Sequence, residues 1–213
     1  MSYKDILENI YKRLFERYGS QDWWPADSPF EVIIGAILTQ NTSWKNVEKA
    51  IQNLKEKNVL APYPLYRLSE MELASLIKPS GYYNIKAGRL KNFLDFFFNE
   101  FEGDINRMFS KEMESLRKKL LMIKGIGEET ADSILLYAGE YPAFVIDNYT
   151  RKILIRHNVV GEGVSYQSMR LLFMNNLCHD VQMFNEYHAL IVKVGKDLCR
   201  KIPLCDRCVL RGV

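Results

Sequence analysis

Apolar residues recur at helical spacing along almost the whole 213-residue chain, and strand-like alternation is almost absent. Residues 2–17 place Tyr3, Leu7, Ile10 and Leu14 on one helix face. The segment 31–40, EVIIGAILTQ, is apolar nearly all round and predicts the buried centre of a helical bundle. The same spacing predicts further helices at 44–57, 69–77, 82–101, 111–121, 128–139 and 147–157, with two more across 165–198. We therefore expect an all-α protein.

Bulk properties narrow the class of protein. No apolar run approaches the ~20 residues of a membrane span, and the N-terminus, MSYKDILENIYKRL, is charged from the start and unlike a signal peptide. We therefore expect a cytoplasmic protein with no membrane partner. The formal charge of +3 is only mildly basic, but basic residues gather near 117–124, 151–156 and 193–211. Such clusters suit either solvated helix faces or a nucleic-acid backbone.

A glycine pair in the segment 121–130, LMIKGIGEET, predicts a tight turn between two helices. Gly125 and Gly127 allow the backbone to turn with its amides pointing outward. The next helix begins near Glu128 and presents free N–H groups in the same direction. This arrangement suits an anionic oxygen such as a DNA phosphate, although a short glycine pattern also occurs in ordinary interhelical turns.

About twenty residues later, Asp147 follows the apolar run Ala-Phe-Val-Ile and precedes another predicted helix. Aspartate at this position can cap the helix, act as a catalytic carboxylate, or do both. Together, KGIGEETA and VIDNYTRK resemble the helix-hairpin-helix and Gly/Pro-Asp signature of the endonuclease III superfamily of DNA glycosylases. The resemblance covers nearly the whole chain. It implies a two-lobed fold, with a six-helix barrel over 26–134 and a second helical lobe pairing 1–25 with 135–213.

The resemblance also implies roles for individual residues. Asp147 matches the superfamily's catalytic aspartate, which stabilises positive charge on the sugar as the base departs. Gln40 or Asn41 matches the loop that fills the gap left by an everted base. The implied partner is double-stranded DNA with a damaged base, bound by a monomer. The implied DNA contacts are Lys124, Gly125, Ile126 and Gly127 in the hairpin, and Tyr83, Asn84 and Lys86 in the turn GYYNIKA.

One departure from the superfamily pattern is informative. Bifunctional members carry a lysine in the hairpin helix that forms a Schiff base and cuts the strand. The alignment places Glu129 at that position, and a carboxylate cannot form an imine. The sequence therefore predicts a monofunctional glycosylase without AP lyase activity.

Aromatic residues favour one branch of the superfamily. The runs Trp23-Trp24-Pro25 and SGYYNIKAGRL resemble the endonuclease III-type 3-methyladenine glycosylases. With Trp44, these tryptophans would form an electron-rich pocket that holds cationic alkylated purines by stacking and cation–π attraction. Core packing is the other interpretation of Trp23 and Trp24. Two further functions remain open: an endonuclease III-like glycosylase for oxidised pyrimidines, with or without lyase activity, and a non-catalytic helix-hairpin-helix DNA-binding module.

Three cysteines near the C-terminus have the spacing C-x5-C-x2-C: Cys199, Cys205 and Cys208. The superfamily's ligand set for a [4Fe–4S] cluster is C-x6-C-x2-C-x5-C. Here the first loop is one residue short, and the fourth cysteine would fall at position 214. Either the protein continues and tolerates the shorter loop, or the cluster has degenerated; zinc is another interpretation. Cys178 is expected to be a buried thiol outside this loop.

Overall fold

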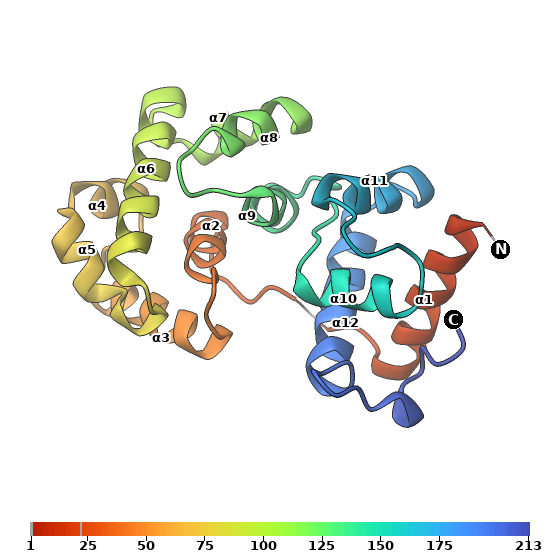
Figure 1. Ribbon diagram of the computed structural model, residues 1–213. Coiled ribbons are helices and arrows are strands. Elements are labelled where there is room, and N and C mark those ends of the chain that lie inside the picture. Colours follow the sequence, from red (N-terminus) through yellow and green to blue (C-terminus); the bar gives the residue numbers. More distant parts are fainter. Residues whose placement is uncertain (1, 22) are drawn as a thin grey trace. The chain divides into compact units, whose positions relative to one another are not determined.

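The computed structural model describes residues 2–21 and 23–213, and the secondary structure of this part of the chain is helical throughout, which confirms the all-α prediction. The chain divides into two compact units, Met1–Pro25 with Glu140–Val213, and Ala26–Gly139. The sequence had predicted a boundary at 134–135, five residues earlier. Figure 1 labels the helices of both units, which are described separately below.

The unit Ala26–Gly139 is built around α2, Pro29–Leu38. Every residue from Phe30 to Leu38 is buried, as the all-round apolar segment predicted, and α2 packs against α3, α6, α9 and η2. Ser28 caps its N-terminus through the backbone N–H of Glu31. The other elements are α3 (Trp44–Glu56), α4 (Pro62–Arg67), α5 (Glu70–Leu76), η1 (Lys78–Ser80), α6 (Tyr83–Phe101), α7 (Ile105–Phe109), α8 (Met113–Leu121), α9 (Glu128–Ser133) and η2 (Ile134–Ala138).

The second unit is built around α12, Val181–Asp197, which packs against α10 and α1. Its buried face brings Phe184 and Tyr187 into an aromatic cluster with Phe144 and Phe173. The phenolic O–H of Tyr187 donates to the carbonyl of Leu7 in α1, so the N-terminal helix is fastened to the C-terminal part of the chain. The other elements are α1 (Tyr3–Tyr18), α10 (Asn148–Arg156), α11 (Tyr166–Asn176) and η3 (Cys205–Arg207).

Among the described residues, no helix is both long and apolar enough to cross a membrane.

Candidate active site

Asp147 is the N-cap of α10, and its two carboxylate oxygens have different surroundings. Oδ1 accepts hydrogen bonds from the backbone N–H of Thr150 at 2.7 Å and from its hydroxyl at 2.8 Å. Oδ2 lies 3.8 Å from Nε2 of His188 in α12. The side chain is 13% exposed. Asp147 can therefore cap α10 and also act as a catalytic carboxylate, because capping engages only Oδ1.

The residues before Asp147 fix its position from inside the core. Phe144 is fully buried and stacks on Phe173, with ring centroids 3.7 Å apart and planes 7° apart. The backbone N–H of Ile146 donates to the hydroxyl of Tyr166 at 3.3 Å. The apolar run predicted to be buried is buried, and it holds Asp147 at the point where the chain leaves the core.

Close helix packing fixes the other side of this site. A Cβ atom at Gly195 of α12 would lie 2.4 Å from Cδ1 of Tyr149 and 2.8 Å from its Cβ. Glycine at this position therefore lets the first turn of α10 lie directly on α12. The contact sets the distance between Asp147 and the helix that carries His188.

Sequence reasoning missed His188 and placed Lys196 only within the basic cluster near 193–211; both lie in α12. His188 is buried, and burial lowers the pKa of its imidazole; the charge of Asp147 opposes this shift and that of Lys196 adds to it. The ammonium of Lys196 also lies 5.5 Å from the ring centroid of Trp23. The sequence signal for His188 was a lone histidine within the apolar stretch 187–192 of a predicted helix.

The hairpin lies in the other unit, between α8 and α9. Gly125 has φ of +99°, a conformation that favours glycine, and a Cβ there would lie 2.3 Å from Cγ of Arg89. Gly127 has φ of −95°, and nothing lies within 4 Å of where its Cβ would be. Only Gly125 of the predicted pair is therefore required by the backbone.

Gln40 binds the hairpin from the end of α2. Its amide nitrogen donates to the carbonyl of Gly125 at 3.1 Å and to the hydroxyl of Thr130 at 2.9 Å, while its amide oxygen accepts from Arg89 of α6. Asn41 beside it is exposed and has φ of +53°. In this structure Gln40 connects the loop after α2 to the hairpin, and Asn41 forms the exposed tip of that loop.

Two basic residues that the sequence placed toward DNA are inside the molecule. Lys86 is 1% exposed, and its ammonium donates to the carbonyls of Leu38 at 2.8 Å and Ser80 at 2.6 Å. Burial lowers its pKa to about 8. The prediction of a direct DNA contact by Lys86 is corrected, since it joins the ends of α2 and η1 instead. Arg117, one of the basic residues near the hairpin, is buried in a bidentate pair with Asp132.

With this geometry in place, similarity to known proteins decides the family. The family model described as the HhH-GPD superfamily base excision DNA repair protein matches residues 34–178. The chain belongs to this family. It is 46% identical to a protein of Methanocaldococcus jannaschii named as a DNA repair glycosylase, over 97% of this chain and 94% of that one. It is also 26% identical to an endonuclease III of Sulfolobus acidocaldarius, over 97% and 94% of the two chains.

Solved structures agree with this assignment. A Helicobacter pylori 3-methyladenine DNA glycosylase bound to 1,N6-ethenoadenine is 26% identical, with a TM-score of 0.75 over 92% of this chain and 98% of that one. An endonuclease III–DNA complex has a TM-score of 0.82 at 19% identity, over 98% and 93%. These findings confirm the predicted resemblance and show a DNA glycosylase of the HhH-GPD base excision repair family.

Few of the residues predicted to contact DNA lie on the surface of the hairpin. Lys124 and Glu129 are exposed, whereas the side chain of Ile126 is 5% exposed and belongs to the core. Its backbone N–H donates to the carbonyl of Ile123 at 3.0 Å, so neither its side chain nor its amide is presented to DNA in this structure. At the start of α6, Asn84 is exposed and Tyr83 is half-buried. Tyr82, which sequence reasoning passed over, is 68% exposed with φ of +46°.

The three tryptophans are divided between the units. Trp23 and Trp24 are half-buried and meet edge to face, with ring centroids 6.3 Å apart. They lie in the unit that contains Asp147, whereas Trp44 is the half-buried first residue of α3 in the other unit. The structure brings Trp23 close to Lys196, which shows that this ring accepts a cation.

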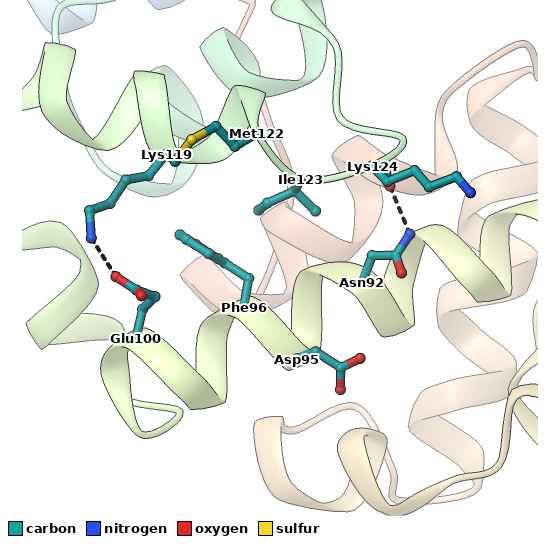
Figure 2. Close-up of a pocket in the computed structure, with 8 residues that line it drawn as sticks. All are labelled: Asn92, Asp95, Phe96, Glu100, Lys119, Met122, Ile123 and Lys124. Atoms are coloured by element: carbon teal, nitrogen blue, oxygen red, sulfur yellow. Dashed lines mark hydrogen bonds and ion pairs between the residues drawn. The ribbon is translucent and has the colours of Figure 1, made fainter.

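A hollow of about 330 Å³ lies in the unit Ala26–Gly139, along α6 and the end of α8. Figure 2 shows the side chains of Phe96 and Ile123 pointing into it, with Lys119 reaching Glu100 at one end. At the other end the amide of Asn92 donates to the carbonyl of Lys124 at 2.9 Å. The hollow therefore borders the hairpin and contains none of the residues predicted to hold the damaged base.

The C-terminal cysteines do not make a complete cluster site. Burial raises the pKa of the Cys208 thiol, and the neighbouring Cys199 and Cys205 raise it further. Arg156 holds the same loop, because its guanidinium donates to Sγ of Cys199 at 3.2 Å and to the carbonyls of Arg200 and Lys201. Among the described residues, no group of three or more histidine, cysteine, aspartate or glutamate side chains is arranged to hold a metal ion. Three thiols with this arrangement do not fit the four-cysteine ligand set of the superfamily.

Cys178 is exposed, so the prediction of a buried thiol was wrong. It follows α11 at the point where the chain turns toward α12.

Gly125→Ala is expected to lower the free energy of unfolding by about 1–3 kcal/mol, because alanine is strained at this φ and its Cβ collides with Arg89. Gly127→Ala is the matched control, since its backbone conformation and surroundings accept a methyl group. Urea unfolding of the two variants and the wild type measures the difference. Equal effects at both glycines would contradict the role assigned to Gly125.

Proposed function

We propose that this glycosylase is monofunctional: it everts a damaged base, most favourably an alkylated purine such as 3-methyladenine, and hydrolyses its N-glycosidic bond. The observation that carries the proposal is the arrangement of Asp147. One carboxylate oxygen is fixed by Thr150, and the other stands at the edge of the core on a rigid helix start. A carboxylate held in this way needs no reorganisation to stabilise a developing positive charge.

Departure of the base leaves an oxocarbenium-like sugar, and Oδ2 of Asp147 supplies the negative charge that stabilises it. The same oxygen can help to deprotonate the water that attacks C1′. Alkylated purines carry a positive charge that weakens this bond, so the reaction needs less acid catalysis at the leaving base. The carboxylate and an oriented water are then sufficient for hydrolysis.

In this proposal the hairpin holds the DNA backbone. The amides of Lys124, Gly125 and Gly127 bind a phosphate, whereas the N–H of Ile126 donates to the carbonyl of Ile123 at 3.0 Å. At the start of α6, the exposed Asn84 and the half-buried Tyr83 contribute further contacts. The loop after α2 supports eversion. Asn41 is the better placed of the two wedge candidates, because the amide of Gln40 is engaged by Gly125, Thr130 and Arg89.

Trp24 and Trp44 are proposed to stack on the everted base. Both are half-buried. One face of Trp23 already carries the Lys196 ammonium, which repels a cationic purine on that face. Trp23 is therefore assigned to the wall of the pocket, where it meets Trp24 edge to face.

The decisive experiment is incubation of purified protein with methylated duplex DNA, followed by chromatography of the released bases. Duplexes with oxidised pyrimidines are treated in parallel. Free 3-methyladenine or 7-methylguanine, with strands cut only after alkali, supports the proposal. Release of bases only from the duplexes with oxidised pyrimidines would instead indicate an endonuclease III-like specificity. The tryptophans would then be interpreted as core-packing residues. Binding without release from either DNA would leave a non-catalytic DNA-binding module.

Wild-type protein is expected to give no covalent adduct with abasic DNA under borohydride, because Glu129 occupies the position of the lyase lysine and cannot form an imine. Glu129→Lys is expected to form the adduct, since residue 129 is exposed in the first turn of α9. Glu129→Gln is the control and should remain untrapped. Gel electrophoresis of the borohydride-treated mixture separates the adduct from free DNA. An adduct with the wild-type protein would refute the monofunctional assignment.

The cysteine loop is proposed to have a structural role, fastened to α10 by Arg156. A [4Fe–4S] cluster on this loop requires a ligand besides Cys199, Cys205 and Cys208. Iron analysis and visible absorbance of the purified protein distinguish a cluster from free thiols, and zinc analysis covers the remaining possibility.

A further inference from the structure

His188 and Asp147 form a pair that neither the capping of α10 nor the packing of α12 requires. The imidazole Nε2 lies 3.8 Å from Oδ2 of Asp147, on the side of the carboxylate that Thr150 does not engage. The separation exceeds a hydrogen bond but is within the range of an ion pair. Both side chains are largely removed from water, at 8% and 13% exposure, so a charge on one acts strongly on the other.

The protonation state of His188 decides the local charge. Burial lowers the pKa of His188 below its usual range, the Asp147 carboxylate raises it, and the Lys196 ammonium lowers it. Lys196 is on the same helix, and Asp147 begins the helix packed beside it. No charged group of α1, which also packs against α12, is among these causes. Burial and Lys196 therefore favour the neutral imidazole, beside a carboxylate whose charge it leaves intact.

Protonation of His188 would change the charge beside Asp147. An imidazolium 3.8 Å from Oδ2 compensates the negative charge of the carboxylate and places a positive charge beside the developing oxocarbenium ion. A histidine that merely filled space in the core would have no such connection with Asp147. We propose that His188 is a proton-linked positioning residue for Asp147, which in its neutral form keeps Oδ2 available as the charged oxygen and in its protonated form disables it.

This inference rests on the proposed catalytic role of Asp147, so the first test avoids turnover. Histidine Cε1–H resonances are followed by NMR across pH in the wild type and in Asp147→Asn, with His188 assigned through His188→Gln. The titration midpoint of His188 is expected to move to lower pH in Asp147→Asn, because the carboxylate that raises its pKa is gone. His157, at the C-cap of α10, and His179 serve as internal controls and should not move. An unchanged His188 midpoint would overturn the pairing.

The second test measures base release in single turnover as a function of pH. In the wild type the rate is expected to fall about tenfold per pH unit below the His188 midpoint. In His188→Gln this fall should disappear, because no imidazole is left to become protonated beside Oδ2. His179→Gln should keep the wild-type profile. The same acid fall in His188→Gln would overturn the proposal.

The two tests separate the possible failures. If the wild type releases no base from any DNA, the proposed function fails, and the NMR experiment still decides whether the two residues are coupled. If base is released and the His188 midpoint is insensitive to Asp147, the function stands and this inference fails. Because Asp147→Asn preserves the cap of α10, the NMR test remains valid even if His188→Gln does not fold, since His157→Gln and His179→Gln then assign the third histidine resonance to His188 by elimination.

Discussion

Asp147→Asn is expected to lower base release by roughly 10²–10³-fold, the usual loss when one preorganised electrostatic group is removed from a transition state. Asparagine keeps the size of the side chain and can still accept from Thr150 through Oδ1. The variant should therefore fold and bind damaged duplex DNA with affinity close to that of the wild type. Single-turnover release and a DNA-binding titration on the same duplex measure the two effects separately.

Asp180 provides a matched control in the same unit. It is also an N-cap aspartate, at the start of α12, where its carboxylate accepts from the backbone N–H of Met183 at 2.6 Å. Asp180→Asn makes the same chemical change at a helix start and is expected to leave base release unchanged. If the two variants lost activity equally, or if Asp147→Asn kept full turnover, Asp147 would be a helix cap and not the catalytic carboxylate.

The fold and the site differ in how much of them could be predicted from the sequence. Helical spacing gave the all-α architecture, because burying a continuous apolar face is a property of consecutive residues. The position of Asp147 followed in the same way from the buried run before it and from the preference of aspartate for a helix start. These features depend on neighbours in sequence.

The residues whose predicted roles the structure changed are positioned by contacts with residues far away in the sequence. Lys86 lies on the buried face of α6 with Leu90 and Phe93, one and two turns farther along, and this spacing was legible in the sequence. The carbonyl groups of α2 and η1 that accept its hydrogen bonds could not be predicted from the sequence. Without such partners, burial of an ammonium group is unexpected. Gln40 shows the same limit, since its engagement with the hairpin joins residues 85 and 90 positions apart.

The basic cluster around the hairpin separates in the structure into charges with different consequences. Arg117 is 6% exposed and holds Asp132, which is fully buried, through hydrogen bonds of 2.6 and 3.1 Å. Lys119, two residues later on α8, pairs with Glu100 near the surface. The first pair fastens α8 to α9 on either side of the hairpin loop, whereas the second is open to solvent.

Arg117→Met is therefore expected to lower the free energy of unfolding by about 3–5 kcal/mol, because it leaves the carboxylate of Asp132 buried without this partner. Lys119→Met, on the same helix, should cost no more than about 1 kcal/mol, since water solvates Glu100 when its partner is removed. The double variant Arg117→Met/Asp132→Leu should recover much of the loss, because it removes the buried carboxylate as well and fills the space with apolar atoms. Urea unfolding of all three variants tests this order. Equal costs for Arg117→Met and Lys119→Met would mean that the stability of the hairpin does not depend on the buried pair.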